Sequence, residues 1–475
     1  MRQVQRLILL ALLVICNITS NAINVTFPTS FEGGWESFIG QTVTFTNDFY
    51  ICDFSGTKAL YLSHRRLRAP EENALGLAQG DSTAYFAIQA ANQKDLIRLW
   101  GISDLDLNAI RKGARITGLT ANVSEPQSMS LVGELTIKDT IFPTQLPDMN
   151  NPRLLVCATN VEHFWTTLGE MGAQTAEQLA RQTQKIATGL VHINADIYAI
   201  CELQEGTAAI SQLTNKMNAL AGDARYAYVD NEFNEYNSDM VGFIYRQDKV
   251  EPYGKLYFPY YSYGSAYHYR MIIKGWREKA TKQQFAISLN HTKSKAGDGN
   301  NDPIRMENVR RLHDAIRTIL NDNIYSDPDI LLVGDYNAYS QEQPNRYLVD
   351  SAQLVDQTLL FDSLNYSYAY GSEVGYLDRV FSTPSMTEQI TAIHPYHINT
   401  DYHRNHEYKY GEDVSMCRYS DHDPILIGLN LFGETAVETV DNNAHNEIRK
   451  VLRDGRIYIL IRDDIYTLYG TKLNP

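Results

Sequence analysis

The stretch DILLVGDYN, residues 329–337, is an apolar run that ends in polar side chains. Its aliphatic residues Ile330 to Val333 predict a buried strand, and Asp335 and Asn337 follow where that strand should stop. Polar residues occupy the same kind of position in four other runs: LLVCATN ends on Asn160, DIYAICE on Glu202 and FAISLNH on His291, while SDHDPILIGL carries Asp421 and His422 at its start. Because strand ends of one sheet can meet at one edge, these runs predict a site at a sheet edge.

Helical segments separate these strand-like runs. The segments 172–193 and 302–322 are the two clearest examples. Alternation of strands and helices from 153 to about 431 is typical of α/β layering, in which helices cover the sheets.

Residues 35–145 have a different character, with short β-branched and aromatic segments separated by turn residues. They predict about five strands, including segments 39–52, 82–90, 114–123 and 129–137, and one helix near 102–112. Five strands with one helix fit a small β-barrel of the OB type. The prolines of FPTQLPDMNNPR, residues 142–153, predict a linker, and the tail 434–475 predicts a β appendage.

The N-terminus has the pattern of a secretory signal. Arg2 and Arg6 precede an apolar run from Leu7 to about Ile18, and small residues up to Ala22 offer a cleavage site. The run is too short for a membrane span, so residues 1–22 predict a secreted, periplasmic or cell-surface protein. Lipidation of Cys16 is an alternative that the sequence leaves open.

Composition and charge limit the function further. The 475 residues are 44% hydrophobic and 21% charged, which is typical of a globular protein. A net charge of -14 argues against a constitutively nucleic-acid-bound protein, although not against an enzyme that releases a polyanion. No cysteine pair has zinc-type spacing, and Cys157 and Cys201 are expected as buried apolar residues in strands.

The polar strand-end residues form a chemically coherent set. Carboxylates and amides supply the oxygen ligands of a hard cation, and two histidines can transfer protons. Metal-assisted phosphoester hydrolysis needs these groups together.

Six motifs, in this order along the chain, resemble the endonuclease/exonuclease/phosphatase superfamily, which includes deoxyribonuclease I. They are TN at 159–160, DIYAICE at 196–202, SLNHTKSK at 288–295, GDYNAY at 334–339, GYLDRVF at 375–381 and SDHDP at 420–424. The resemblance covers residues 152–432 and implies two packed β-sheets flanked by helices, a four-layer sandwich. With the β-rich region in front, the chain looks most like secreted bacterial nucleases of that superfamily.

The resemblance also implies metal ligands and phosphate-positioning residues. Glu202, six residues after Asp196, stands where the family places its metal-binding glutamate, and Glu205 is the rival position. Asn160 and Asp421 are expected to support the metal, which is expected to be Mg²⁺, with Mn²⁺ or Ca²⁺ as alternatives. Asp335 is expected either to bind a second metal or to polarise the attacking water, and Asn337, like Asn160, is expected to help position metal and phosphate.

Proton transfer is assigned to two histidines. The resemblance pairs His422, the expected general base, with Asp378, and pairs His291 with Asp239. Lys293 and Lys295 are expected to contact flanking phosphates of the substrate.

These expectations together describe a secreted Mg²⁺-dependent phosphodiesterase whose substrate is DNA or RNA. One alternative is a phosphoesterase of the same superfamily that acts on sphingomyelin, inositol phosphates or another phosphoester. A second alternative is a non-catalytic surface binding protein.

Overall fold

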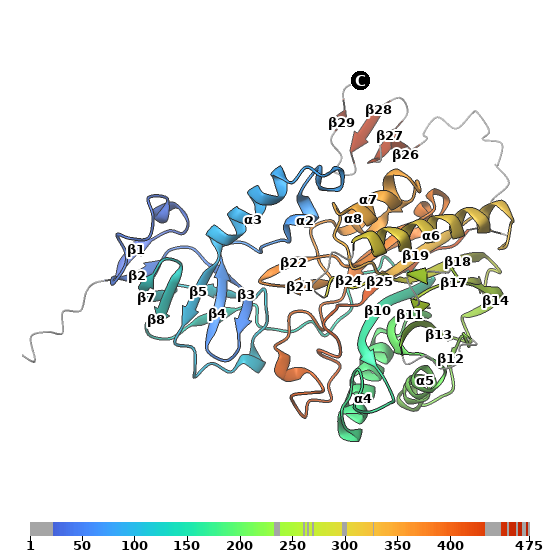
Figure 1. Ribbon diagram of the computed structural model, residues 1–475, viewed down its shortest axis with the longest axis horizontal. Coiled ribbons are helices and arrows are strands. Elements are labelled where there is room, and N and C mark those ends of the chain that lie inside the picture. The colour runs from blue at the N-terminus through green and yellow to red at the C-terminus, as the bar shows by residue number, and fades with distance from the viewer. Residues whose placement is uncertain are drawn as a thin grey trace, which may run out of the picture.

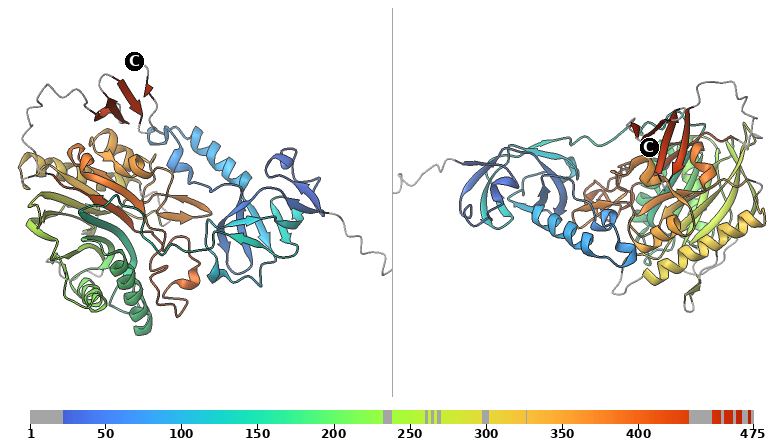
Figure 2. Two further views of the ribbon diagram at one scale, coloured as in Figure 1. Left: turned by 180° about the vertical axis from the view of Figure 1, so that it is seen from behind. Right: turned by 90° about the horizontal axis from the view of Figure 1, so that it is seen from above.

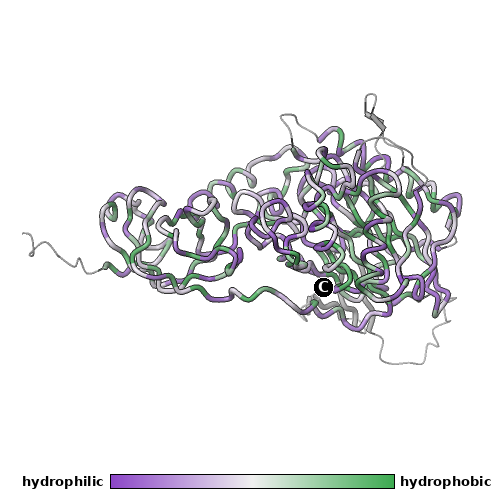
Figure 3. The backbone as a smooth tube through the Cα atoms, turned by 90° about the horizontal axis from the view of Figure 1, so that it is seen from below, coloured by the Kyte–Doolittle hydropathy of each residue, from purple (hydrophilic) through white to green (hydrophobic). Residues whose placement is uncertain are grey.

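The computed structural model describes residues 22–231, 238–259, 262–263, 266–267, 270–296, 302–325, 327–432, 448–453, 456–461, 464–467 and 472–473. The expected signal at 1–22, apart from Ala22, and Cys16 within it lie outside the described residues. Two units lie side by side along the long axis of the molecule, an N-terminal unit and a larger two-sheet unit (Figures 1, 2 and 3). No described helix is long and apolar enough to cross a membrane.

The N-terminal unit is built on one sheet whose strands pair in the order β1-β2-β7-β8-β5-β4-β3-β6-β9. The strands are β1 (Ile23–Val25), β2 (Thr42–Phe45), β3 (Phe49–Ser55), β4 (Ala59–Ser63), β5 (Ile97–Trp100), β6 (Arg115–Thr117), β7 (Thr120–Glu125), β8 (Ser128–Leu131) and β9 (Thr136–Lys138). Pairing leads from β3 through β4, β5, β8 and β7 to β2, which directly precedes β3 in the chain. The strands pack around a core that includes Phe45, Ile51 and Leu99.

Two sequence expectations for this unit are wrong. The segment 82–90, expected as a strand, lies in the helix α3 (Thr83–Asp95). Four alanines between 84 and 91 favour a helix, and Phe86 is 61% exposed, so the aromatic residues do not pack as they would in a strand.

The helix expected near 102–112 is reduced to a single 3₁₀ turn, Leu107–Ala109. Ile102, Leu107 and Ile110 are all buried in the core of the unit. Because these three side chains anchor the segment to the core, it follows the sheet as an irregular loop.

The two-sheet unit holds two six-stranded sheets. The first has the order β12-β13-β11-β10-β25-β24 and the second the order β14-β17-β18-β19-β23-β20. Their strands are β10 (Leu154–Phe164), β11 (Ile197–Gln204), β12 (Tyr226–Tyr228), β13 (Asp239–Arg246), β14 (Val250–Tyr257), β17 (Met271–Glu278), β18 (Gln284–His291), β19 (Ile330–Asp335), β20 (Val355–Asp356), β23 (Asp378–Ser382), β24 (Ile390–Pro395) and β25 (Ile425–Leu429).

Apolar side chains pack the two sheets face to face. Ala199 and Ile427 of the first sheet share one core with Ile287 and Val380 of the second. The helices α4 (Ala176–Ile193) and α5 (Ala208–Ala221) cover the outer face of the first sheet, and α6 (Asp302–Asn321) and α7 (Gln343–Asp350) cover that of the second. The expected four layers of helix, sheet, sheet and helix are present in the described residues.

Smaller elements complete the chain. They are α2 (Pro70–Asn73), α8 (Gln357–Asp362), and the two-stranded pairs β15 (Ser262–Tyr263) with β16 (Ala266–Tyr267) and β21 (Tyr368–Tyr370) with β22 (Glu373–Gly375). The tail contributes antiparallel strands β26 (Ile448–Arg453), β27 (Arg456–Ile461), β28 (Asp464–Thr467) and β29 (Lys472–Leu473), in line with the expected β appendage.

The cysteines of the described residues are all free thiols. Cys52, Cys157 and Cys201 are buried, and Cys417 is partly buried. Cys157 and Cys201 lie within β10 and β11, which confirms the expectation of apolar filler in strands.

Candidate active site

The register of three neighbouring strands places the polar strand ends side by side. His291 at the end of β18 pairs with Asp335 at the end of β19, and Asp335 pairs with Asp378 at the start of β23. The first sheet contributes Asn160 and Glu202 from β10 and β11, which run parallel to each other. All five residues therefore meet at one edge that the two sheets share.

Short distances connect these side chains across the two sheets. Asn160 Nδ2 donates to Glu202 Oε1 at 2.9 Å and lies 3.3 Å from Asp335 Oδ2. His291 Nε2 lies 3.6 Å from Glu202 Oε1 and 3.7 Å from Asp335 Oδ2. Asn160, Glu202, His291 and Asp335 thus form one cluster.

The backbone is bent into uncommon conformations where the cluster forms. Glu202 and Asn337 have φ of 65° and 46°, a region that non-glycine residues rarely adopt. The Asn337 N–H donates to Asp335 Oδ1 at 2.8 Å, which closes the turn after β19. Strain of this kind persists where surrounding contacts enforce it, and it is common at functional sites.

Gly334 allows β19 to approach β18 closely. Its φ is 128°, and a Cβ at this position would lie 2.0 Å from the Asn290 carbonyl oxygen. Only glycine fits this geometry, and it brings Asp335 next to His291.

The donor set fits a divalent cation. Two groups have ligand atoms within 4.8 Å of one another: Glu202, His291 and Asp335 form one, and Asp335, Asp378 and His422 form the other. Within the described part of the chain, neither Glu202 nor Asp335 forms an ion pair with a lysine or arginine. Burial raises the pKa of Glu202, and burial together with nearby Asp378 raises the pKa of Asp335 to about 7. A bound cation would relieve this cost of burying carboxylates.

His422 and Asp378 form a buried pair. His422 Nδ1 lies 2.7 Å from Asp378 Oδ2, and His422 Nε2 lies 3.9 Å from Asp335 Oδ2. Burial opposes the charged imidazolium, but Asp378, Asp335 and Asp421 outweigh burial and raise the pKa of His422 well above its usual value. The ring of Tyr368 packs against His422, with centroids 4.6 Å apart.

The other acidic residues of SDHDP have separate surroundings. Asp421 is partly buried, and its charge helps to raise the pKa of Glu202 and of Glu162. Asp423 is fully buried and accepts hydrogen bonds from the Asn399 and Thr400 N–H groups at 2.8 and 3.0 Å. Asp421 thus adds negative potential at the site, while Asp423 fixes a loop.

Asp239 has a different partner from the one that the resemblance implied. Its Oδ1 lies 3.1 Å from His163 Nδ1 and accepts a hydrogen bond from Trp165 Nε1 at 2.7 Å. Its influence on His291 is electrostatic only, and burial lowers the pKa of His291 well below its usual value. The expected Asp239–His291 pair is therefore replaced by an Asp239–His163 pair.

His163 is a site residue that the sequence argument missed. It follows Asn160 by three residues, and its Nδ1 also lies 3.4 Å from Glu202 Oε2. Burial opposes protonation, but the hydrogen bond to Asp239 and the charge of Glu202 raise the pKa of His163 to about 9. Its φ of 54° turns the chain back toward the site. Proximity to Asn160 in the sequence was the only available signal.

The two lysines lie beside the site but are not equally available to a substrate. Lys295 Nζ lies 2.5 Å and 2.6 Å from the two carboxylate oxygens of Glu342. The Lys293 backbone N–H donates to Asn308 Oδ1 at 3.2 Å, which anchors the loop that carries both residues. Lys295 therefore forms an ion pair with Glu342, and contact of either lysine with a flanking phosphate stays a prediction.

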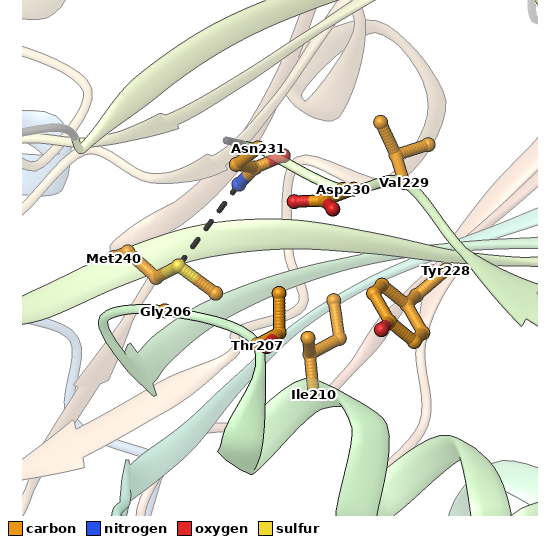
Figure 4. Close-up of a pocket in the computed structure, with 8 residues that line it drawn as sticks. All are labelled: Gly206, Thr207, Ile210, Tyr228, Val229, Asp230, Asn231 and Met240. Carbon is orange, nitrogen blue, oxygen red and sulfur yellow. Dashed lines mark hydrogen bonds between the residues drawn. The ribbon is translucent and has the colours of Figure 1, made fainter. Parts of the chain in front are cut away.

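Side chains alternate across β13, so the residue after Asp239 faces away from the cluster. Met240 lines a small pocket between α5 and the end of β12, together with Ile210 and Asn231 (Figure 4). This pocket therefore lies outside the candidate active site.

No described protein family and no curated protein matches the chain. Solved structures do match it. The human Nocturnin catalytic domain with bound sulfate has 14% sequence identity and a TM-score of 0.40, and the match covers 59% of this chain and 94% of that one. An endonuclease/exonuclease/phosphatase family protein from Bacteroides thetaiotaomicron has 16% identity and a TM-score of 0.41, with coverage of 58% and 98%.

A mannosyl-6-phosphatase, also from Bacteroides thetaiotaomicron, has 16% identity and a TM-score of 0.42, with coverage of 58% of this chain and 100% of that one. A structure from Bacteroides vulgatus that is described as an endonuclease/exonuclease/phosphatase has 13% identity and a TM-score of 0.40, with coverage of 59% of this chain and 99% of that one.

Proposed function

We propose that the protein is a metal-dependent phosphodiesterase of the endonuclease/exonuclease/phosphatase superfamily, and that it hydrolyses DNA or RNA. The observation that carries this proposal is the meeting of the His422–Asp378 pair with Asn160, Glu202, His291 and Asp335 at one edge of two sheets. A proton acceptor and a cation site lie within one hydrogen-bonded cluster, and phosphoester hydrolysis needs both.

The chain's own residues would divide the work as follows. Neutral His422 takes a proton from water through Nε2, while Asp378 holds Nδ1–H and stabilises the imidazolium that forms. The water oxygen forms a bond to phosphorus as the bond to the leaving oxygen breaks. His291, which burial keeps neutral, donates a hydrogen bond to a phosphoryl or leaving oxygen.

Glu202 and Asp335 would hold a divalent cation, Mg²⁺ being the first choice, with Asn160 and Asp421 in support. When bound, the cation neutralises charge that develops on the phosphoryl oxygens. Asn337 is assigned to hold the turn that aims Asp335, since its N–H already bonds to that carboxylate.

Two further parts of the proposal concern the N-terminal region. Residues 1–22 are a signal peptide, so the mature protein is secreted or lies at the cell surface. The N-terminal unit is an OB-like barrel, and a single sheet that takes up β2 and β3, neighbours in the chain, at separate places in its order supports this. Such a barrel would offer a second surface for an extended substrate.

One observation favours the same phosphoester hydrolysis on a substrate other than nucleic acid. Glu342 pairs with Lys295, and the charge of Asp421 acts on Glu202 and Glu162 at the cluster, which weakens attraction for a polyanion. A small phosphoester, such as an inositol phosphate or a lipid headgroup, is therefore the second candidate.

A substrate panel tests the proposal. Purified protein is incubated with plasmid, single-stranded DNA, RNA, sphingomyelin, inositol phosphates and bis(p-nitrophenyl) phosphate, with Mg²⁺ or Mn²⁺ and with chelator. We expect chelator-sensitive cleavage of nucleic acid that His422→Ala abolishes. The matched control is His394→Ala, because His394 also pairs with an aspartate, Asp362 at 3.0 Å, but lies outside the cluster. An enzyme that is inert toward every substrate, or that His422→Ala leaves fully active, would refute the proposal.

A further inference from the structure

The N-terminal unit places a buried carboxylate behind the candidate active site. The short helix α2, seen at the junction of the two units in Figure 1, carries Glu72, which is 4% exposed. The chain just before α2 pairs with β22 of the other unit: the Val374 N–H donates to the Leu67 carbonyl, and the Ala69 N–H donates to the Val374 carbonyl, both at 3.0 Å. This pairing fixes Glu72 against the segment that leads into β23.

Glu72 contacts two segments of the other unit. One leads into Asp378, and the other follows Asp335. One carboxylate oxygen accepts a hydrogen bond at 2.5 Å from the Tyr376 backbone N–H, two residues before Asp378. The other oxygen accepts from the Ser340 hydroxyl, in the loop that follows β19. Arg379 Nη1 lies 3.9 Å from the first oxygen and donates to Ser340 Oγ at 3.0 Å.

Arg379 makes the contribution of Glu72 difficult to replace. Its side chain is fully buried, and its other terminal nitrogen donates to Asp356. Burial alone would lower the pKa of Arg379, but Asp356 and Glu72 hold it above the usual value. A buried guanidinium that loses one of its anionic partners is strongly destabilised, so the surrounding backbone would move to find a new partner.

The backbone around Asp378 is held at consecutive residues. Glu72 holds the Tyr376 N–H, the Tyr336 N–H donates to the Leu377 carbonyl at 2.9 Å, and the Asp378 N–H donates to Ser367 Oγ at 3.1 Å. Glu72 is the one anchor in this series that comes from the N-terminal unit.

We propose that Glu72 is a positioning residue: the N-terminal unit uses it to set the geometry of the His422–Asp378 pair and of the loop after Asp335. The catalytic consequence rests on the proposed hydrolase function, whereas the structural consequence does not. The N-terminal unit is then a part of the active centre as well as a surface for substrates.

Three variants test this inference: Glu72→Ala, Glu72→Gln and the control Asn92→Ala. Asn92 is 2% exposed and spans the same interface, donating to the Arg68 carbonyl at 2.8 Å and to Glu373 Oε1 at 2.6 Å, but it does not contact Tyr376, Ser340 or Arg379. The first measurement is hydrogen–deuterium exchange of peptides that cover 374–382, which requires no activity. We expect exchange about tenfold faster in Glu72→Ala than in Asn92→Ala.

The second measurement is steady-state hydrolysis of bis(p-nitrophenyl) phosphate with Mn²⁺. We expect kcat to fall about 10- to 100-fold in Glu72→Ala with KM nearly unchanged, since misplacement of a catalytic group affects the chemical step. Glu72→Gln should recover part of kcat, because its amide oxygen can still accept from the Tyr376 N–H but no longer gives Arg379 an anionic partner. If wild-type protein hydrolyses nothing, the hydrolase proposal fails, and the exchange data still decide the role of Glu72. Equal exchange and equal kcat in Glu72→Ala and Asn92→Ala would overturn the inference.

Discussion

The imidazole of His422 and the carboxylate of Asp378 are 2.7 Å apart, yet they belong to different sheets. Asp378 is the first residue of β23, and His422 lies just before β25. Their hydrogen bond therefore connects the two layers of the sandwich at the edge where the carboxylates gather. The catalytic proposal requires that the two sheets keep their relative position at this edge.

Substitution of Asp378 by asparagine should reduce turnover sharply. Asparagine keeps the shape of the side chain but removes the charge that stabilises protonated His422, so we expect kcat to fall by about 10²- to 10⁴-fold. Initial rates on the substrate found active in the panel measure this effect. Asp362→Asn, which alters the similar pair with His394, provides the control and should leave kcat unchanged.

The pH dependence should follow the raised pKa of His422. A raised pKa means that the imidazolium persists above the usual range, and a general base must be neutral. We therefore expect kcat/KM to rise with pH and to reach half its maximum above pH 6.5, the ordinary histidine value. In Asp378→Asn this midpoint should move to lower pH, because the nearest carboxylate no longer favours the imidazolium. A midpoint that stays in place would exclude His422 as the titrating base.

Divalent cations should stabilise the fold through Glu202. A ligand that binds only the native state at 100 times its Kd adds about 2.7 kcal/mol to the free energy of unfolding. Thermal unfolding with and without Mg²⁺ or Mn²⁺ measures this gain, and Glu202→Gln should remove most of it. Glu251→Gln is the control, because Glu251 pairs with Arg277 at 2.9 Å outside the cluster. Equal stabilisation of both variants would place the cation elsewhere.

Replacement of Gly334 by alanine should disturb both stability and activity. The added Cβ would lie 2.0 Å from the Asn290 carbonyl oxygen at a φ of 128°, so we expect a loss of about 3 kcal/mol or more in the free energy of unfolding. Gly222→Ala is a matched control: its φ is 78°, but no atom lies within 4 Å of the added Cβ, so the expected loss is about 1–2 kcal/mol. Chemical denaturation distinguishes the two variants, and similar losses would contradict the close approach of β18 and β19.

The sequence predicted those strands whose run of apolar residues matches their burial in the folded protein. Long apolar runs such as that of β19 are buried on both faces, so their strand character and polar ends were visible in the residues alone. The strand prediction for 82–90 was wrong because short apolar stretches fit either a strand or a helix. The exposure of Phe86, which distinguishes the two, is known only from the structure.

The limits of the site prediction have a similar origin. Strand ends that pair in register, such as Asp335 and Asp378, could be anticipated from motif order. The partner of Asp239 could not, because the left-handed turn at His163 redirects that side chain toward the carboxylate. Glu72 also remained hidden, since its contacts join residues about 300 positions apart in the sequence.

The free, buried cysteines have a practical consequence for the oxidation state of the protein. Cys52, Cys157 and Cys201 are buried, and burial raises the pKa of the Cys52 thiol to about 11, which leaves it unreactive at neutral pH. The described fold contains no disulfide whose formation would need an oxidant. These buried thiols should therefore react with a thiol reagent only when the fold opens, which makes their rate of labelling a probe of local opening.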